Sequence, residues 1–178
     1  MLEKYFNNRI AILYITPFII GSLAVFSFQP FNFTVINFFI LPTFLFFLVL
    51  IKKKSKSIYR KKPFKKNLFI YGTSFGFGFY LSGLYWISNS LTFDENFKFL
   101  IPFSLILIPL FLSLFFSLVT MLAGPFLNFN ISSIFFLSGS LAFSDYLRSK
   151  ILTGFPWNLW SYSFSWATEI IQVLNKIG

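Results

Sequence analysis

Cysteine and histidine are both absent from the 178 residues. The lack of cysteine excludes a disulfide framework, a thiolate metal site and a cysteine nucleophile within these residues. The lack of histidine removes the usual general base and the commonest metal ligand. Acidic side chains are scarce as well, and the five present are Glu3, Asp94, Glu95, Asp145 and Glu169. This inventory supports little chemistry, and we predict neither a metal nor a cofactor.

Charge of either sign is rare, because only 11% of the residues are charged while 56% are hydrophobic, and the mean hydropathy is +0.74. A typical soluble domain is about one quarter charged. Crossing a bilayer takes about 17–25 apolar residues, and five runs have that length. These runs are 10–28, 33–51, 67–90, 99–123 and 131–147. The sequence therefore predicts an all-α integral membrane protein, a bundle of about five transmembrane helices.

Small residues gather in the third apolar run. Gly72 and Gly76 are spaced four apart, and so are Ser74 and Gly78. In lipid, such pairs let helix backbones approach closely, because packing and not hydrophobicity drives helix association there. We expect this helix to contact more of its neighbours than any other.

Basic residues concentrate in the loop 52–66, between the second and third runs. Nine of the chain's 15 basic residues lie there, namely Lys52, Lys53, Lys54, Lys56, Arg60, Lys61, Lys62, Lys65 and Lys66. A nucleic-acid patch is one interpretation, but a short basic loop between two spans is the orientation signal of the positive-inside rule. We therefore predict a cytoplasmic loop 52–66, a cytoplasmic N-terminus and no nucleic-acid partner. The loop 148–170 then lies on the other face, the periplasmic face of a bacterial inner membrane.

The predicted outer loop is rich in aromatic residues. Thr153-Gly154 and Phe155-Pro156 favour a turn and an extended segment, and Trp157, Trp160 and Tyr162 follow closely. Such residues are typical of an interfacial anchor, and a functional loop on a membrane scaffold is the alternative. Asp145 and Arg148 are three residues apart, so they share one helix face. That pair marks either the membrane boundary or part of a site.

Several of these segments resemble one known family. The stretch Ser144–Trp157, SDYLRSKILTGFPW, with Tyr162-Ser163 after it, is similar to apolipoprotein N-acyltransferases. Gln29-Pro30-Phe31, Gly83–Trp86 and the closing Lys176-Ile177-Gly178 resemble other parts of that family in the same order. The resemblance covers essentially the whole chain, and its most specific part is the stretch like L-x-x-G-F-P-W at Ile151–Trp157, where Ile151 takes the first position. It departs in two places, because Asp145 stands where the family usually has Glu and Trp160-Ser161 replaces a more typical Leu-Gly.

This resemblance implies an enzyme of lipoprotein maturation. Such enzymes transfer an acyl chain from a membrane phospholipid, usually phosphatidylethanolamine, to the diacylglyceryl-cysteine terminus of an apolipoprotein. Their chemistry belongs to a periplasmic nitrilase-like domain with a Glu–Lys–Cys triad, which follows two further spans. Residues 1–178 would form the N-terminal transmembrane domain, with the start of a sixth span, and no triad residue can be carried over.

We accordingly expect these 178 residues alone to be inactive, as a truncated or partial form or as half of an enzyme with a separately encoded catalytic half. Phe155, Trp157 and Trp160 are the candidates for contact with acyl chains or with the catalytic domain. Asp145 and Arg148 are expected to be a structural boundary pair. The alternative from another class is a small non-catalytic multispan membrane protein with a transport or assembly role.

Overall fold

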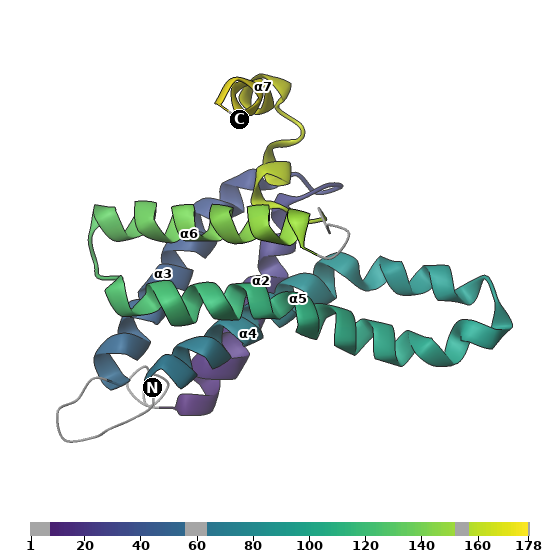
Figure 1. Cartoon of the computed structure of the whole chain (residues 1–178), viewed down its shortest axis with the longest axis horizontal. Coiled ribbons are helices and arrows are strands. Elements are labelled where there is room, and N and C mark those ends of the chain that lie inside the picture. The colour runs from purple at the N-terminus through teal and green to yellow at the C-terminus, as the bar shows by residue number, and fades with distance from the viewer. Residues whose placement is uncertain (1–7, 56–63, 152–156, 178) are drawn as a thin grey trace.

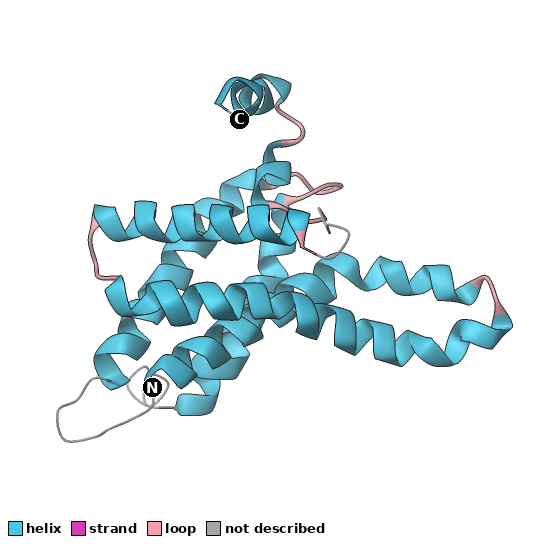
Figure 2. Ribbon diagram, viewed as in Figure 1, coloured by secondary structure: helices cyan, strands magenta, loops and turns pink. Residues whose placement is uncertain are grey.

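The computed structural model describes residues 8–55, 64–151 and 157–177, and within those ranges it contains helices and turns but no strand (Figure 2). The predicted all-α class is therefore confirmed. The main helices are α2 (Thr16–Ala24, flanked by helical turns at Ala11–Ile15 and Val25–Ser27), α3 (Asn37–Ser55), α4 (Phe64–Leu84), α5 (Ile101–Ala123), α6 (Ile131–Lys150) and α7 (Thr168–Ile177).

Among the residues that the structure describes, two helical stretches are long and apolar enough to cross a membrane. They are Thr34–Lys54, with 21 residues, and Glu95–Phe126, with 32 residues. At about 1.5 Å per residue, each exceeds the roughly 30 Å of a bilayer core. A third apolar helix, Ala11–Ser27, is shorter.

Helix α4 lies at the centre of the bundle, packed most extensively against α5 and then against α2 (Figure 1). Close approach depends on its small residues. A Cβ added at Gly72 would lie 2.2 Å from Thr120 Oγ1 in α5, and one at Gly78 would lie 2.2 Å from the Phe18 carbonyl oxygen in α2. The expected role of the small residues in the third apolar run is confirmed, because no larger side chain fits at either contact.

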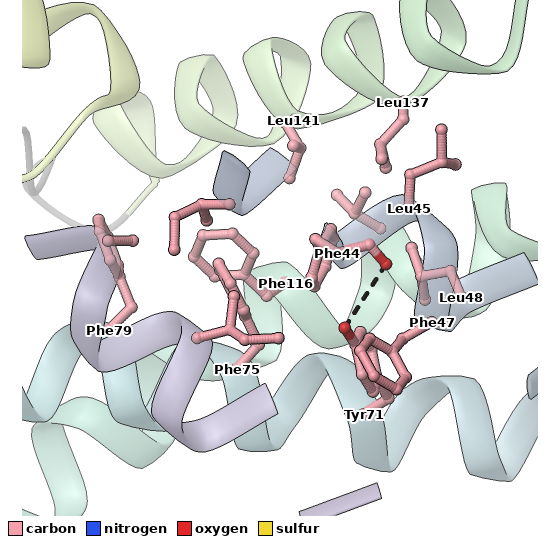
Figure 3. Packing of buried hydrophobic residues seen from close by; sticks show 14 of the residues in the cluster. Phe44, Leu45, Phe47, Leu48, Tyr71, Phe75, Phe79, Phe116, Leu137 and Leu141 are labelled. Carbon is pink, nitrogen blue, oxygen red and sulfur yellow. Dashed lines mark hydrogen bonds between the residues drawn. The ribbon is translucent and has the colours of Figure 1, made fainter. Parts of the chain in front are cut away.

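Aromatic rings fill the space between α3, α4 and α5 (Figure 3). The ring centroids of Phe44 and Phe75 lie 4.4 Å apart, and those of Phe75 and Phe116 lie 5.1 Å apart. From above, Leu137 and Leu141 of α6 point down toward this cluster (Figure 3). Helix α6 is thereby anchored through a narrow strip of leucines.

The connection between α4 and α5 differs from the expectation. The apolar run predicts a single helix over 67–90 and a loop after it, but α4 ends at Leu84 and tighter helical turns follow at Tyr85–Thr92 and Glu95–Leu100. Asp94 starts the second turn by accepting a hydrogen bond from the Asn96 amide at 2.9 Å, as an N-cap residue does. The end of α4, the two tighter turns and the start of α5 thus form an arm that extends away from the rest of the bundle (Figure 1, right).

The bundle has two chemically distinct ends. At the basic end, defined by Arg9, Lys52, Lys53, Asn67 and Asn128, the Lys52 ammonium donates to the Leu127 carbonyl at 2.7 Å. At the same end Arg9 Nη2 donates to Asn67 Oδ1 at 3.0 Å. The aromatic end is defined by Phe28, Trp86, Trp157, Trp160 and Trp166, and it contains the candidate site.

Candidate functional site

Arg148, in the last turn of α6, is the most deeply buried charged residue of the aromatic end, at 1% exposure. Its Nη1 donates to the Trp157 carbonyl at 2.6 Å, and its Nη2 donates to the Asn158 carbonyl at 3.4 Å. The guanidinium also lies 5.2 Å from the ring centroid of Tyr80 in α4, within cation–π range. The arginine therefore holds the returning loop by its backbone and joins that loop to the central helix.

Asp145 completes this clamp. Its Oδ1 accepts from Arg148 Nη2 at 3.1 Å, and its Oδ2 accepts from the Trp160 amide at 3.0 Å. Because the pair is spaced i, i+3 on one helix, both side chains reach the same side of the loop. Helix α6 continues to Lys150, past the expected end at residue 147, and this extension keeps Arg148 on the helix beside Asp145. The two charges together fix the backbone from Trp157 to Trp160.

Asn158 makes the tight turn between the two tryptophans possible. Its φ is +54°, a left-handed conformation that asparagine adopts more readily than most residues. That turn lets the Trp157 and Asn158 carbonyls both face Arg148. Asn158 is absent from the residues that the sequence predicted for the site, although an asparagine between two aromatic residues was a usable signal.

The two tryptophans have different environments. Trp160 is partly buried and stacks on Phe79 of α4, with ring centroids 5.6 Å apart and planes at 16°. Trp157 is 50% exposed and meets Trp86 edge to face at 5.3 Å. Trp160 is thus part of the scaffold, whereas Trp157 presents an aromatic surface to the exterior.

A second set of contacts ties the following turn, Trp160–Phe164, to the start of α3. Thr34 Oγ1 donates to the Ser163 carbonyl at 2.7 Å and lies 2.6 Å from the donating Trp166 Nε1. Asn37 Nδ2 donates to Ser163 Oγ at 3.2 Å. These partners are about 130 positions apart in the sequence, so no local pattern could have indicated them.

The structure brings together four of the five candidate residues, because Trp157 and Trp160 are both held by the Asp145–Arg148 pair. Phe155 lies outside the described residues, as do Gly154 and Pro156. Within the described part of the chain, no three His, Cys, Asp or Glu side chains are grouped so that they could hold a metal. The site is therefore an aromatic surface whose backbone is held by the Asp145–Arg148 pair.

Comparison with known proteins adds a family relationship. Residues 20–178 match the family model of the apolipoprotein N-acyltransferase N-terminal domain. The Apolipoprotein N-acyltransferase of Brucella suis is 29% identical over 167 residues, covering 92% of this chain and 31% of the relative. The Rickettsia typhi protein of the same name is 34% identical over 163 residues (90% and 30%), and the Rhizobium etli protein is 32% identical over 161 residues (89% and 29%). The chain spans about three tenths of the length of these curated relatives.

Proposed function

This chain belongs to the apolipoprotein N-acyltransferase family, and we propose that it forms the N-terminal membrane domain of such an enzyme. The complete enzyme would transfer an acyl chain from a membrane phospholipid to the N-terminal diacylglyceryl-cysteine of an apolipoprotein. The observation that best supports a role for these residues is the clamped aromatic surface. The Asp145–Arg148 pair uses a buried charge to hold one loop, and that loop presents Trp157 to the exterior.

We assign to this surface the role of a wall that contacts lipid or the catalytic part of the enzyme. Aromatic rings with polar atoms suit the boundary between hydrocarbon and water. Trp157 and its neighbour Trp86 form the exposed part of that wall, and Trp160 supports it from within. The role of Phe155 in this wall stays a prediction from the sequence.

In the proposed membrane placement, five spans are formed by the Ala11–Ser27 segment, α3, α4, α5 and α6, and α7 begins a sixth. The basic end faces the cytoplasm and the aromatic end faces the periplasm, in a bacterial inner membrane. Support comes from the side chains gathered at the basic end, where Lys52 and Arg9 bond to groups at other helix ends.

Catalysis itself needs groups that these 178 residues lack. A family nucleophile would be a cysteine, and the chain contains neither cysteine nor histidine. We infer that the 178 residues by themselves transfer no acyl group and that they act with a catalytic portion of the enzyme. Their direct partners would be the phospholipid acyl donor, the apolipoprotein acceptor and that portion.

Complementation tests the proposal. The 178 residues are expressed in cells depleted of their own N-acyltransferase, alone or with the catalytic portion of a related enzyme, and triacylation of a reporter lipoprotein is measured by mass spectrometry. We expect no triacylation from the chain alone and restored triacylation from the combination. Triacylation by the chain alone would contradict its inactivity, and failure of the combination with a well-inserted chain would contradict the assigned role.

A matched pair of variants tests the wall. Trp157→Ala should reduce triacylation in the combination, whereas Phe143→Ala, an exposed aromatic on α6, should leave it unchanged. Equal activity of wild type and Trp157→Ala, with equal amounts of inserted protein, would refute the role of Trp157.

A further inference from the structure

The segment Gly83–Trp86 joins the end of α4 to the tighter helical turn that follows it. The indole of Trp86 turns back along this segment, and its Nε1 donates to the Gly83 carbonyl at 3.1 Å. This bond ties the orientation of the Trp86 ring to the backbone of Gly83. The same ring meets Trp157 edge to face, with the ring planes at 74°. The exposed Trp157 ring therefore contacts a partner whose orientation is set by α4.

Gly83 also leaves room for the loop that carries Trp157. A Cβ added at Gly83 would lie 2.1 Å from Asn158 Nδ2, which is closer than real contacts come. The absence of a side chain thus lets the Asn158 amide lie directly against α4. The added atom would lie 3.5 Å from Val25 Cγ2, which is an ordinary van der Waals contact. Of these neighbours, Asn158 is therefore the one that a larger residue at position 83 would displace.

Asn158 can pass such a displacement to Trp157, its neighbour in the chain. Its φ of +54° is left-handed, and the backbone conformation restricts which side-chain rotamers are allowed. The displaced amide thus has few alternative positions, so the backbone of the loop has to move with it. The only printed bond from Arg148 to this residue, Nη2 to the Asn158 carbonyl, is long at 3.4 Å and gives little resistance. The loop is held from α6 by its carbonyls and is seated on α4 by this amide.

We propose that Gly83 is a positioning residue for the aromatic wall, because it seats the Asn158 amide and orients the Trp86 indole. It thereby fixes the angle at which the exposed rings of Trp86 and Trp157 meet. The clamp on α6 bonds to backbone atoms of the loop, so the orientation of the Trp157 ring is left to its contacts with α4. The importance of this geometry for acyl transfer rests on the proposed function, in which the two rings form the exposed part of the wall.

Fluorine NMR reports the geometry of the rings. The chain has four tryptophans, so incorporation of fluorotryptophan gives four signals from the purified chain in micelles, and replacing each tryptophan in turn by Phe assigns them. We expect Gly83→Ala to shift the signals of Trp86 and Trp157, because the fluorine shift responds to the position of a neighbouring ring. The signals of Trp160 and Trp166 should stay in place. Shifts of all four signals, or of none, would overturn the proposal.

Two further variants separate positioning from a general effect of the added methyl group. Asn158→Gly removes the displaced amide and tolerates a φ of +54°. Adding Gly83→Ala to Asn158→Gly should therefore shift neither signal further, and an undiminished shift would refute transmission through Asn158. Gly139→Ala on α6, where an added Cβ would meet nothing within 4 Å, is the matched control and should shift no signal. If Gly83→Ala does not fold, Asn158→Gln extends the amide from the other side of the contact and should shift the same two signals.

Triacylation by the combination with the catalytic portion tests the consequence for transfer. Gly83→Ala should reduce it about tenfold, because a misplacement of about 1 Å far from the reacting atoms can cost on the order of 100-fold in rate. Gly139→Ala should keep the wild-type level, and the double variant should match Asn158→Gly alone. Unchanged triacylation in Gly83→Ala, with the two signals shifted, would contradict the part of Gly83 in transfer. The NMR measurement involves no transfer, so a wild-type combination without triacylation would count against the proposed function alone.

Discussion

Each end of the bundle has a cation that bonds to a turn, but the sequence separation between the cation and its partners differs greatly between the two ends. At each end a cation donates to carbonyl groups of a turn that helical hydrogen bonds do not satisfy. Arg148 reaches carbonyls nine and ten positions away, whereas Lys52 reaches one 75 positions away. The bonds of the Arg148 cation to the loop are therefore closed within one local segment, whereas those of the Lys52 cation join segments that are distant in the sequence.

The cation at the aromatic end is also the more deeply buried of the two. Arg148 is 1% exposed and also contacts Asp145 and the Tyr80 ring, while Lys52 is 9% exposed and binds Leu127 and Asn128. An arginine fork can serve several acceptors at fixed geometry, and an ammonium acts as a point charge. We infer that loss of Arg148 disturbs one loop at the aromatic end, whereas loss of Lys52 weakens the attachment of α3 to the turn after α5.

The largest effect is expected from Arg148→Met. The substitution leaves Asp145 partly buried without its cation and frees two carbonyls, and breaking a buried pair in this way costs about 3–5 kcal/mol. The free energy of unfolding is measured by circular dichroism in mixed micelles with increasing SDS. Lys150→Met, in the same turn of α6 but exposed, is the control and should change it by less than about 0.5 kcal/mol. Equal stabilities of the two variants would contradict the clamp.

Trp160→Ala should have the next largest effect on the free energy of unfolding. It removes a ring stacked on Phe79 and packed beside Phe28, and truncation of a large aromatic in a packed site costs about 3 kcal/mol, here reduced by partial exposure. Trp157→Ala, at an exposed ring, should cost less than about 1 kcal/mol in the same unfolding assay. A larger loss of stability for Trp157→Ala than for Trp160→Ala would contradict the assignment of Trp160 as the supporting ring and Trp157 as the exposed one.

Part of this arrangement can be predicted from the sequence. The i, i+3 spacing of Asp145 and Arg148 and the aromatic cluster after them are local patterns, so the sequence alone indicates the positions of the candidate site. The small residues of α4 likewise indicate its central packing. The partners Tyr80, Thr34 and Ser163 have no such signal, because each contact is made across many residues and depends on how the helices pack.

At the basic end, Lys52→Met should have an intermediate effect. It removes two hydrogen bonds from an ammonium to Leu127 and Asn128, and bonds to a charged group contribute about 1.5–3 kcal/mol. The exposed Lys66→Met serves as the matched control for the loss of one basic residue. Because these bonds join distant segments, hydrogen exchange should rise in both α3 and the turn after α5. A rise confined to α3 would contradict the long-range role.

The smallest effect is expected from Lys53, the neighbour of Lys52. Its ammonium lies 4.5 Å from the ring centroid of Phe129, and an exposed cation–π contact is worth about 0.5–1 kcal/mol. A double-mutant cycle of Lys53→Met and Phe129→Leu isolates this coupling from the general loss of charge, which Lys66→Met reports separately. We expect a coupling energy within that range and little change when salt is raised, since the two partners are in direct contact. A coupling of zero would mean that Lys53 adds nothing to the attachment of α3 to this turn through Lys52, and it would sharpen the contrast with the several contacts that converge on Arg148.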